Sequence, residues 1–127
     1  MRVLVTGGAG FIGSHVVEAL LAGGHELRVL DDLSSGKREN LPEGVGLVVE
    51  DIRSAEAAGC VRAYGADAMV HLAAQMDVRR SVEDPLFDAD VNVRGSLNLL
   101  EACREAGTRR VIFASTGGAI YGEQESF

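Results

Sequence analysis

Short apolar runs alternate with longer amphipathic stretches along the 127 residues. The apolar runs predict five strands, at Arg2–Thr6, Leu27–Leu30, Leu47–Val49, Ala68–Leu72 and Arg110–Ala114. Apolar residues at helical spacing predict helices over about Gly10–Ala22, Ser54–Tyr64 and Pro85–Ala106. Strands that are continuously apolar and alternate with helices indicate a parallel sheet that is covered on both faces.

This alternation predicts one α/β domain over residues 1–127, with the three layers of a Rossmann fold. Right-handed crossovers give the parallel sheet the strand order 3-2-1-4-5, with the ligand in the crevice at the carboxyl ends of strands one and four. Ser54 and Asp84 are predicted helix N-caps, and Gly107 is a predicted helix end. The polar stretch 34–42 is predicted to be a loop or a short helical turn.

The first strand leads directly into three glycines, Gly7, Gly10 and Gly13, and a helical pattern follows. Gly7 permits a sharp turn, Gly10 leaves space for phosphate oxygens beside backbone N–H groups, and Gly13 lets the helix pack closely. The start of the helix adds unpaired N–H donors and a positive dipole end. The pattern therefore predicts a pyrophosphate site, with an ordinary strand-to-helix turn as the alternative.

Two aspartates, Asp31 and Asp32, follow the second strand about 20 residues beyond the glycines, where a dinucleotide site places an acidic residue. A carboxylate there accepts hydrogen bonds from both ribose hydroxyls of adenosine and repels a 2′-phosphate. Asp31 therefore favours NAD over NADP. The alternative is that Asp31 is a solvated turn residue, and for Asp32, taken by itself, a turn residue is the simpler explanation.

Three further stretches lie at the predicted carboxyl ends of strands. In 51–53, Asp51 could accept from an adenine amino group while Ile52 packs on the ring, although a helix-capping aspartate is an equal alternative. The small residues of 72–75 leave room for the nicotinamide ribose and phosphates, or form a plain loop. Ser115 and Thr116 could hydrogen-bond a sugar hydroxyl or its carbonyl product, or cap a turn.

Asn92, inside the long predicted helix, could bond a loop backbone and hold the shape of the site, or lie on the helix surface. His71 is best explained as a buried, hydrogen-bonded imidazole. No His, Cys, Asp or Glu spacing suggests a metal site.

Composition limits the classes of partner. The net charge of −7 argues against a nucleic-acid partner. Cys60 and Cys103 are isolated and are typical of core residues in a reducing compartment. The N-terminal apolar run is broken by glycines, so we expect neither a signal peptide nor a membrane span. We expect a cytoplasmic location.

Taken together, these residues resemble the extended short-chain dehydrogenase/reductase superfamily. Within it they most resemble the nucleotide-sugar epimerases and dehydratases, nearest the UDP-glucose 4-epimerase type. The matching strings occur in the family's order over nearly the whole chain: Thr6–His15, Asp31–Lys37, Asp51–Arg53, His71–Gln75, Ser81–Pro85, Asn92–Gly95 and Ser115–Glu123.

The resemblance implies NAD as cofactor and a UDP-sugar as the substrate of the full-length family. By the resemblance, the pyrophosphate residues are Gly7, Gly10, Phe11, Ile12 and Gly13. The adenosine ribose residues are Asp31, Asp32, Leu33, Ser34, Ser35 and Gly36, and Asp51 and Ile52 flank adenine. The residues that line the central stretch of the cofactor are Leu72, Ala73, Ala74 and Gln75, and Asn92 lies behind them. Thr116, or Ser115, would be the hydroxyl that assists catalysis.

The family reaction is a reversible hydride transfer at the sugar C4 through a keto intermediate, in which the tyrosine of a Tyr-x-x-x-Lys pair takes the hydroxyl proton. That pair is absent here. The only lysine is Lys37, and neither Tyr64 nor Tyr121 has a lysine four places on. We therefore expect a chain truncated before the sixth strand and the substrate-binding region, inactive alone and weak in binding NAD.

Two other interpretations stay open. One is a non-catalytic module that senses or sequesters NAD, although residues 123–127 end without a cap and so favour truncation. The other is a fragment of a nucleotide-sugar 4,6-dehydratase, although the string 115–121 favours an epimerase. The helix predicted over Pro85–Ala106 could also pair with a second copy to form a homodimer.

Overall fold

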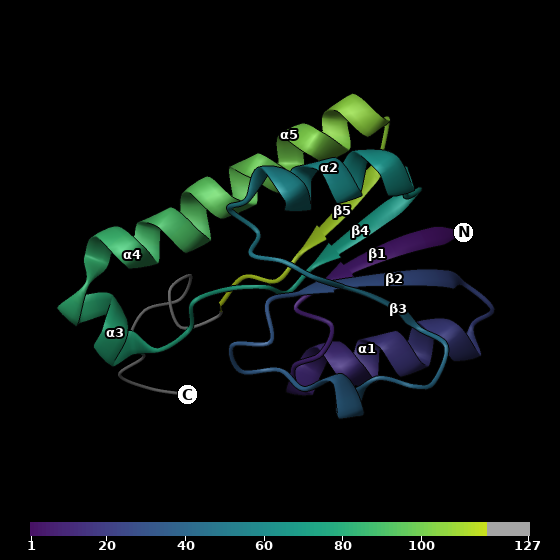
Figure 1. The fold of residues 1–127 in the computed structure, drawn as a ribbon, viewed down its shortest axis with the longest axis horizontal. Coiled ribbons are helices and arrows are strands. Elements are labelled where there is room, and N and C mark those ends of the chain that lie inside the picture. Colours follow the sequence, from purple (N-terminus) through teal and green to yellow (C-terminus); the bar gives the residue numbers. More distant parts are fainter. Residues whose placement is uncertain (117–127) are drawn as a thin grey trace, which may run out of the picture.

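The computed structural model describes residues 1–116, which form a parallel sheet between two helical layers (Figure 1). The strands are β1 (Arg2–Thr6), β2 (Glu26–Asp31), β3 (Gly46–Val49), β4 (Ala68–His71) and β5 (Arg110–Phe113). The sheet order β3-β2-β1-β4-β5 confirms the predicted topology. The predicted features of residues 117–127, Tyr121 among them, lie outside the described residues.

The helical elements are α1 (Phe11–Ala22), η1 (Arg38–Asn40), α2 (Ala55–Tyr64), α3 (Val78–Glu83), α4 (Pro85–Ala89), η2 (Asp90–Gly95) and α5 (Ser96–Ala106). Helices α2 and α5 lie side by side on one face of the sheet, and α1 covers the other (Figure 1). Within residues 1–116, no helix has the length and apolarity needed to cross a membrane.

The central strand β1 is buried on both faces. Val3 and Val5 point into the core beneath α1, and Leu4 points into the core beneath α2 and α5. All three side chains are at most 2 % exposed, which explains the uninterrupted apolar run in the sequence. Because Thr6 pairs in register with Leu30 and His71, the loops that follow β1, β2 and β4 begin at one edge of the sheet.

Helix ends follow the predicted capping residues. The Ser54 hydroxyl accepts from Ala57 N at 2.9 Å, and the Asp84 carboxylate accepts from Phe87 N at 3.0 Å. Gly107 closes α5 with a φ of +74°. The polar stretch after β2 contains the short 3₁₀ turn η1, as predicted.

The prediction of a uniform α-helix over Pro85–Ala106 is wrong in its middle, where the π-helical segment η2 widens the turn. The Ser96 hydroxyl, at the start of α5, donates to Asn92 O in η2 at 2.7 Å. A Cβ at Gly95 would lie 2.7 Å from Ile52 Cγ1, so the widened turn is pressed against its neighbour. Apolar periodicity does not distinguish one wide turn from a regular one.

The sequence also missed α3. Its N-cap is Asp77, whose carboxylate accepts from Arg79 N at 2.9 Å. The apolar residues Val78 and Val82 are 74 % and 78 % exposed, so α3 presents no buried stripe. An element that does not face the core leaves no helical periodicity in the sequence.

Buried His71 joins the sheet to α5. Its Nε2 lies 2.9 Å from Ser96 Oγ, and its Nδ1 lies 2.6 Å from Thr6 Oγ1. Because the Ser96 hydroxyl proton is donated to Asn92 O, we assign the ring proton to Nε2, and Nδ1 accepts from Thr6. The neutral ring therefore fits this chain of hydrogen bonds, and a second ring proton would oppose it.

We predict that Gly13→Ala destabilises the domain by about 1–3 kcal/mol, because the new methyl group would overlap Gly7 O and approach Gly8 Cα to 2.7 Å. Gly59→Ala in α2 is the matched control, since a Cβ there meets nothing within 4 Å. It should stabilise by about 0.5–1 kcal/mol. Urea unfolding measures both, and equal effects would contradict the packing at Gly13.

A second prediction concerns pH. Burial lowers the pKa of His71 below its ordinary value of 6.5, so the unfolded chain binds the proton more readily than the folded one. The free energy of unfolding should be constant above that value and fall as the pH drops from about 7 toward 5. In His71→Gln the fall over this window should be smaller, and an identical slope would show that His71 does not cause it.

Candidate functional site

The loop after β1, residues 7–10, is fixed from behind by the loop after β2. Gly7 N donates to Leu30 O at 2.9 Å at the end of β2. Ala9 O accepts from Lys37 N at 3.1 Å and from Asn40 Nδ2 at 2.8 Å. A Cβ at Gly36 would lie 2.8 Å from the carbonyl carbon of Ala9, so the two loops touch through backbone.

The three glycines of this loop differ in what surrounds them. Gly7 has a φ of +68°, and a Cβ there would lie 2.7 Å from Ala73 N in the loop after β4. At Gly13 a Cβ would overlap the carbonyl of Gly7. At Gly10 a Cβ would meet only Gly7 O, at 3.4 Å, and otherwise open space. Gly7 thus permits a sharp turn and Gly13 permits close packing, as the sequence predicted, and Gly10 leaves open space above the loop.

The first turn of α1 faces that open space. Its N-cap is Gly10, which contributes no side-chain hydrogen bond, and the turn contains no acidic residue. The backbone N–H groups of Phe11, Ile12 and Gly13 belong to the first turn, where an α-helix supplies no carbonyl partner. The side chains of Phe11 and Ile12 are 81 % and 67 % exposed. This helix end therefore offers donors and a positive dipole to an anion.

Asp31 lies behind the loop and is only 7 % exposed. Its Oδ2 accepts from Ala9 N and its Oδ1 accepts from Leu33 N, each at 2.9 Å. Leu33 has a φ of +59°, so the carboxylate holds the loop after β2 in a left-handed turn that a leucine rarely adopts. Each oxygen of Asp31 keeps one further acceptor position.

The remaining residues of the loop after β2 have different surroundings. Asp32 is exposed, and its Oδ1 accepts from the backbone N and the hydroxyl of Ser34 at 2.9 and 2.6 Å. These contacts are those of a turn-forming aspartate. Ser35 is exposed, whereas Gly36 is buried against Ala9.

After β3, Asp51 and Ile52 point in different directions. Asp51 accepts from Arg53 N at 2.8 Å and from the Arg53 guanidinium, which holds the pKa of the Asp51 carboxyl below its ordinary value. It does not cap α2, because Ser54 does. Ile52 is 5 % exposed and packs in the core beside Leu99, so its side chain does not lie on an open surface as expected for ring packing.

After β4, two side chains fix the loop backbone. Thr6 Oγ1 accepts from Leu72 N and Ala73 N, both at 3.2 Å. Asn92 pairs with the backbone of Gln75: its Oδ1 accepts from Gln75 N and its Nδ2 donates to Gln75 O, both at 2.8 Å. The predicted contact between Asn92 and a loop backbone is therefore present.

The side chain of Gln75 ties the loop to α3 and α4. Its Nε2 donates to Ser81 Oγ and Asp88 Oδ1, each at 3.0 Å. Ala74 is exposed at the surface of the same loop. The amide of Gln75 thus holds the fold together here and does not extend into open space.

Ser115 and Thr116 follow β5 and are both exposed. Ala114 N donates to His71 O at 3.2 Å, which continues the β4–β5 pairing up to these hydroxyls. They therefore begin at the same edge of the sheet as the loop after β4.

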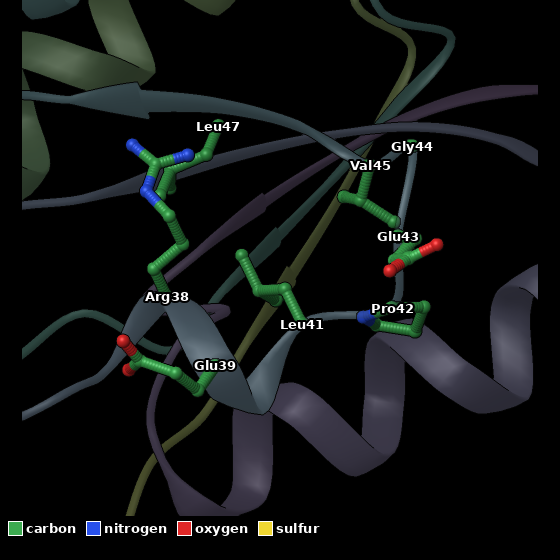
Figure 2. Close-up of a pocket in the computed structure, with 8 residues that line it drawn as sticks. All are labelled: Arg38, Glu39, Leu41, Pro42, Glu43, Gly44, Val45 and Leu47. Carbon is green, nitrogen blue, oxygen red and sulfur yellow. The ribbon is translucent and has the colours of Figure 1, made fainter.

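Two shallow hollows lie elsewhere on the described part of the chain. One, of about 430 Å³, lies between η1 and β3 and is lined by Arg38, Leu41 and Val45 among others (Figure 2). The other, of about 580 Å³, lies beside Met1 and Gly107, at the amino ends of the strands. Neither contains a predicted cofactor residue. The candidate site at the glycine loop has an open surface and is not a hollow. It is therefore located by the geometry of this loop and by the backbone N–H groups at the start of α1.

Sequence reasoning missed several residues that shape the site. Thr6 and Asn98 act through side-chain hydrogen bonds to the loops, Ser96 bonds to Asn92 O and to the ring of His71, and Arg53 bonds to two carboxylates. The one available signal was at Thr6, a hydroxyl at the end of an otherwise apolar strand. Each of the others has a partner that is distant in sequence: His71 for Ser96, Ile52 for Asn98 and Asp90 for Arg53.

Comparison with known proteins identifies relatives that match nearly the whole chain in sequence and in fold. The chain is 48 % identical over 132 aligned residues to the UDP-glucose 4-epimerase of Mycolicibacterium smegmatis, covering 100 % of this chain and 42 % of the relative. A crystal structure of Thermus thermophilus UDP-glucose 4-epimerase in complex with NAD has a TM-score of 0.93 at 58 % identity, covering 98 % of this chain and 40 % of the other.

The UDP-glucose 4-epimerase of Thermotoga maritima, crystallised with UDP-glucose, has a TM-score of 0.92 at 46 % identity and covers 100 % of this chain and 41 % of the other. The chain thus spans about two fifths of the length of these relatives. The model of the NAD dependent epimerase/dehydratase family matches residues 3–127. With its sheet order, its glycine loop and this match over nearly its whole length, the chain belongs to the NAD dependent epimerase/dehydratase family.

Proposed function

We propose that this chain binds NAD, as the cofactor-binding portion of a UDP-glucose 4-epimerase-like protein. The observation that carries the proposal is the open space at Gly10 in front of the uncapped first turn of α1. A pyrophosphate there would accept hydrogen bonds from the N–H groups of Phe11, Ile12 and Gly13. The NAD complex of the Thermus thermophilus relative, at 58 % identity, supports the same cofactor.

The other predicted residues fit the two ends of this cofactor. The free acceptor positions of Asp31 suit the ribose diol of adenosine, and the ionised Asp51 suits the adenine amino group. Leu72, Ala73 and Ala74 would lie beside the central stretch, on a backbone that Thr6 and Asn92 hold. Ile52 would contribute through its backbone, since its side chain is in the core.

NAD, when bound, supplies a hydride acceptor. This chain's own contribution beside it would be the hydroxyl of Thr116 or Ser115, which hydrogen-bonds the sugar hydroxyl or its carbonyl product. The 127 residues contain no tyrosine followed four places on by lysine, so the chain itself supplies no such general base. We propose a UDP-sugar as the substrate of the whole protein, because the relatives are UDP-glucose 4-epimerases, which also favours an epimerase over a dehydratase.

We also retain the proposal that the helix running from α4 to α5 pairs with a second copy. Val93, Leu97 and Leu100 follow one another at helical spacing and are 59 %, 60 % and 37 % exposed. This row supports an apolar contact along the helix.

Calorimetry should show that the chain binds NAD at least about tenfold more tightly than NADP, because Asp31 accepts from the ribose diol and repels a 2′-phosphate. Asp31→Asn should reduce this ratio to about threefold or less. The ratio is informative even if the variant is less stable, since both ligands meet the same protein.

Glu18→Gln is the matched control for that experiment. It removes one negative charge from the exposed face of α1, and the NAD-to-NADP ratio should stay unchanged. A preference for NADP in the unaltered chain would exclude Asp31 from the ribose site, and no binding of either dinucleotide would refute the proposed function.

The 127-residue chain alone should not interconvert UDP-glucose and UDP-galactose at a measurable rate, with NAD present at millimolar concentration. The physical reason is the missing general base: the hydroxyl of Thr116 or Ser115 can hydrogen-bond the sugar but is too weakly basic to take its proton. Chromatographic separation of the two UDP-sugars after long incubation measures this, and turnover that scales with protein concentration would contradict it.

A further inference from the structure

The guanidinium of Arg53 joins two carboxylates from different parts of the chain. Its Nη2 lies 2.6 Å from Asp51 Oδ2, and its Nη1 lies 2.8 Å from Asp90 Oδ2 in η2. Its Nε is shared between the two oxygens of Asp51, at 3.0 and 3.1 Å. The pKa of Arg53 is raised and the pKa values of both carboxyls are lowered by these hydrogen bonds, so all three groups stay charged.

An aromatic ring completes the surroundings of Arg53. Its guanidinium carbon lies 5.2 Å from the centroid of the Phe87 ring, and that of Arg80 lies 3.8 Å from the same centroid. The Arg53 side chain is 29 % exposed, so water reaches it only in part. Planar pairing with a carboxylate and contact with an aromatic ring are properties of arginine that lysine does not reproduce.

The loop that carries Arg53 is held independently to η2 and α5. Asn98 Nδ2 donates to Ile52 O at 2.8 Å and to Ser54 O at 2.9 Å. Gly95 packs directly against the side chain of Ile52. The loop backbone therefore has support of its own, and the particular contribution of Arg53 is to the orientation of Asp51.

That contribution can be stated in acceptor positions. An ionised carboxylate offers about four, and the Arg53 backbone N, Nε and Nη2 supply three protons to Asp51. One acceptor position of Asp51 is left, and Arg53 sets the direction in which it points. The Asp51 side chain is 35 % exposed, so a ligand can reach this carboxylate.

We propose that Arg53 is a positioning residue that orients Asp51 to recognise the 6-amino group of adenine. The inference rests on the proposed binding of NAD. A single remaining acceptor position matches an amino donor and disfavours an oxo group, which is itself an acceptor. Arg53 thereby makes the site selective for adenine over hypoxanthine. This selectivity acts at the base of the dinucleotide and is separate from the contacts to its pyrophosphate.

The test compares NAD with nicotinamide hypoxanthine dinucleotide, which has an oxo group in place of the 6-amino group and a proton on the neighbouring ring nitrogen N1. Calorimetric titration of the 127-residue chain should show about tenfold tighter binding of NAD. Arg53→Gln should lower this preference to less than about twofold. A role confined to folding would weaken both ligands equally and leave the preference intact, and that result would overturn the inference.

Arg62→Gln is the matched control, because Arg62 forms a comparable ion pair with Glu105, at 2.9 Å, elsewhere in the layer of α2 and α5. It should leave the base preference unchanged. Arg53→Lys keeps the charge and tests the case in which Arg53→Gln fails to fold. It should lower the preference to about threefold, because an ammonium lacks the planar two-point contact.

Asp51→Asn completes the test as a double-variant cycle. If Arg53 acts through Asp51, the double variant should discriminate no less than Asp51→Asn alone. A further loss in the double variant would overturn the inference. Equal binding of both dinucleotides by the unaltered chain would also overturn it and leave the proposed function standing, whereas no binding of NAD would refute the proposed function itself.

Discussion

Close backbone contact between the loop after β1 and its neighbours is the constraint on which the rest of this structure depends. Gly7 touches the loop after β4, Gly13 touches Gly7, and Gly36 touches Ala9. Atoms larger than hydrogen at these positions would separate the loops. The packing is possible because the three neighbouring strands β2, β1 and β4 of the parallel sheet bring their loops to one edge.

Side chains then fix what the backbone has brought together. Asp31 bonds the loops after β1 and β2 to each other, Thr6 holds the loop after β4 to β1, and Asn92 holds that loop to the helical segment η2. Nearly all of these bonds join a side chain to a backbone group. A site built in this way is preorganised, and its ligand-facing donors can remain unpaired because other atoms carry the structural bonds.

The sequence predicted the strands, the sheet order, the sharp turn at Gly7 and the close packing at Gly13, because each depends on local pattern or on general rules of handedness. It also located Asp31 and Asn92, whose positions relative to a strand end and a helix are readable. It did not predict the pairing of Arg53 with Asp90, since those residues are 37 positions apart and charged residues at exposed positions have many available partners. It placed Ile52 beside a ligand, whereas the side chain lies in the core, because an apolar residue at a strand end suits both environments.

The central claim is that the N–H groups at the start of α1 bind a diphosphate. Amide chemical shifts of the ¹⁵N-labelled chain, recorded during titration with NAD and with ADP, test it most directly. Both ligands should shift the signals of Gly10 to Gly13 more than any others, and in the same direction. Largest shifts among residues 38–47, or shifts at the glycine loop with NAD that ADP does not reproduce, would contradict it.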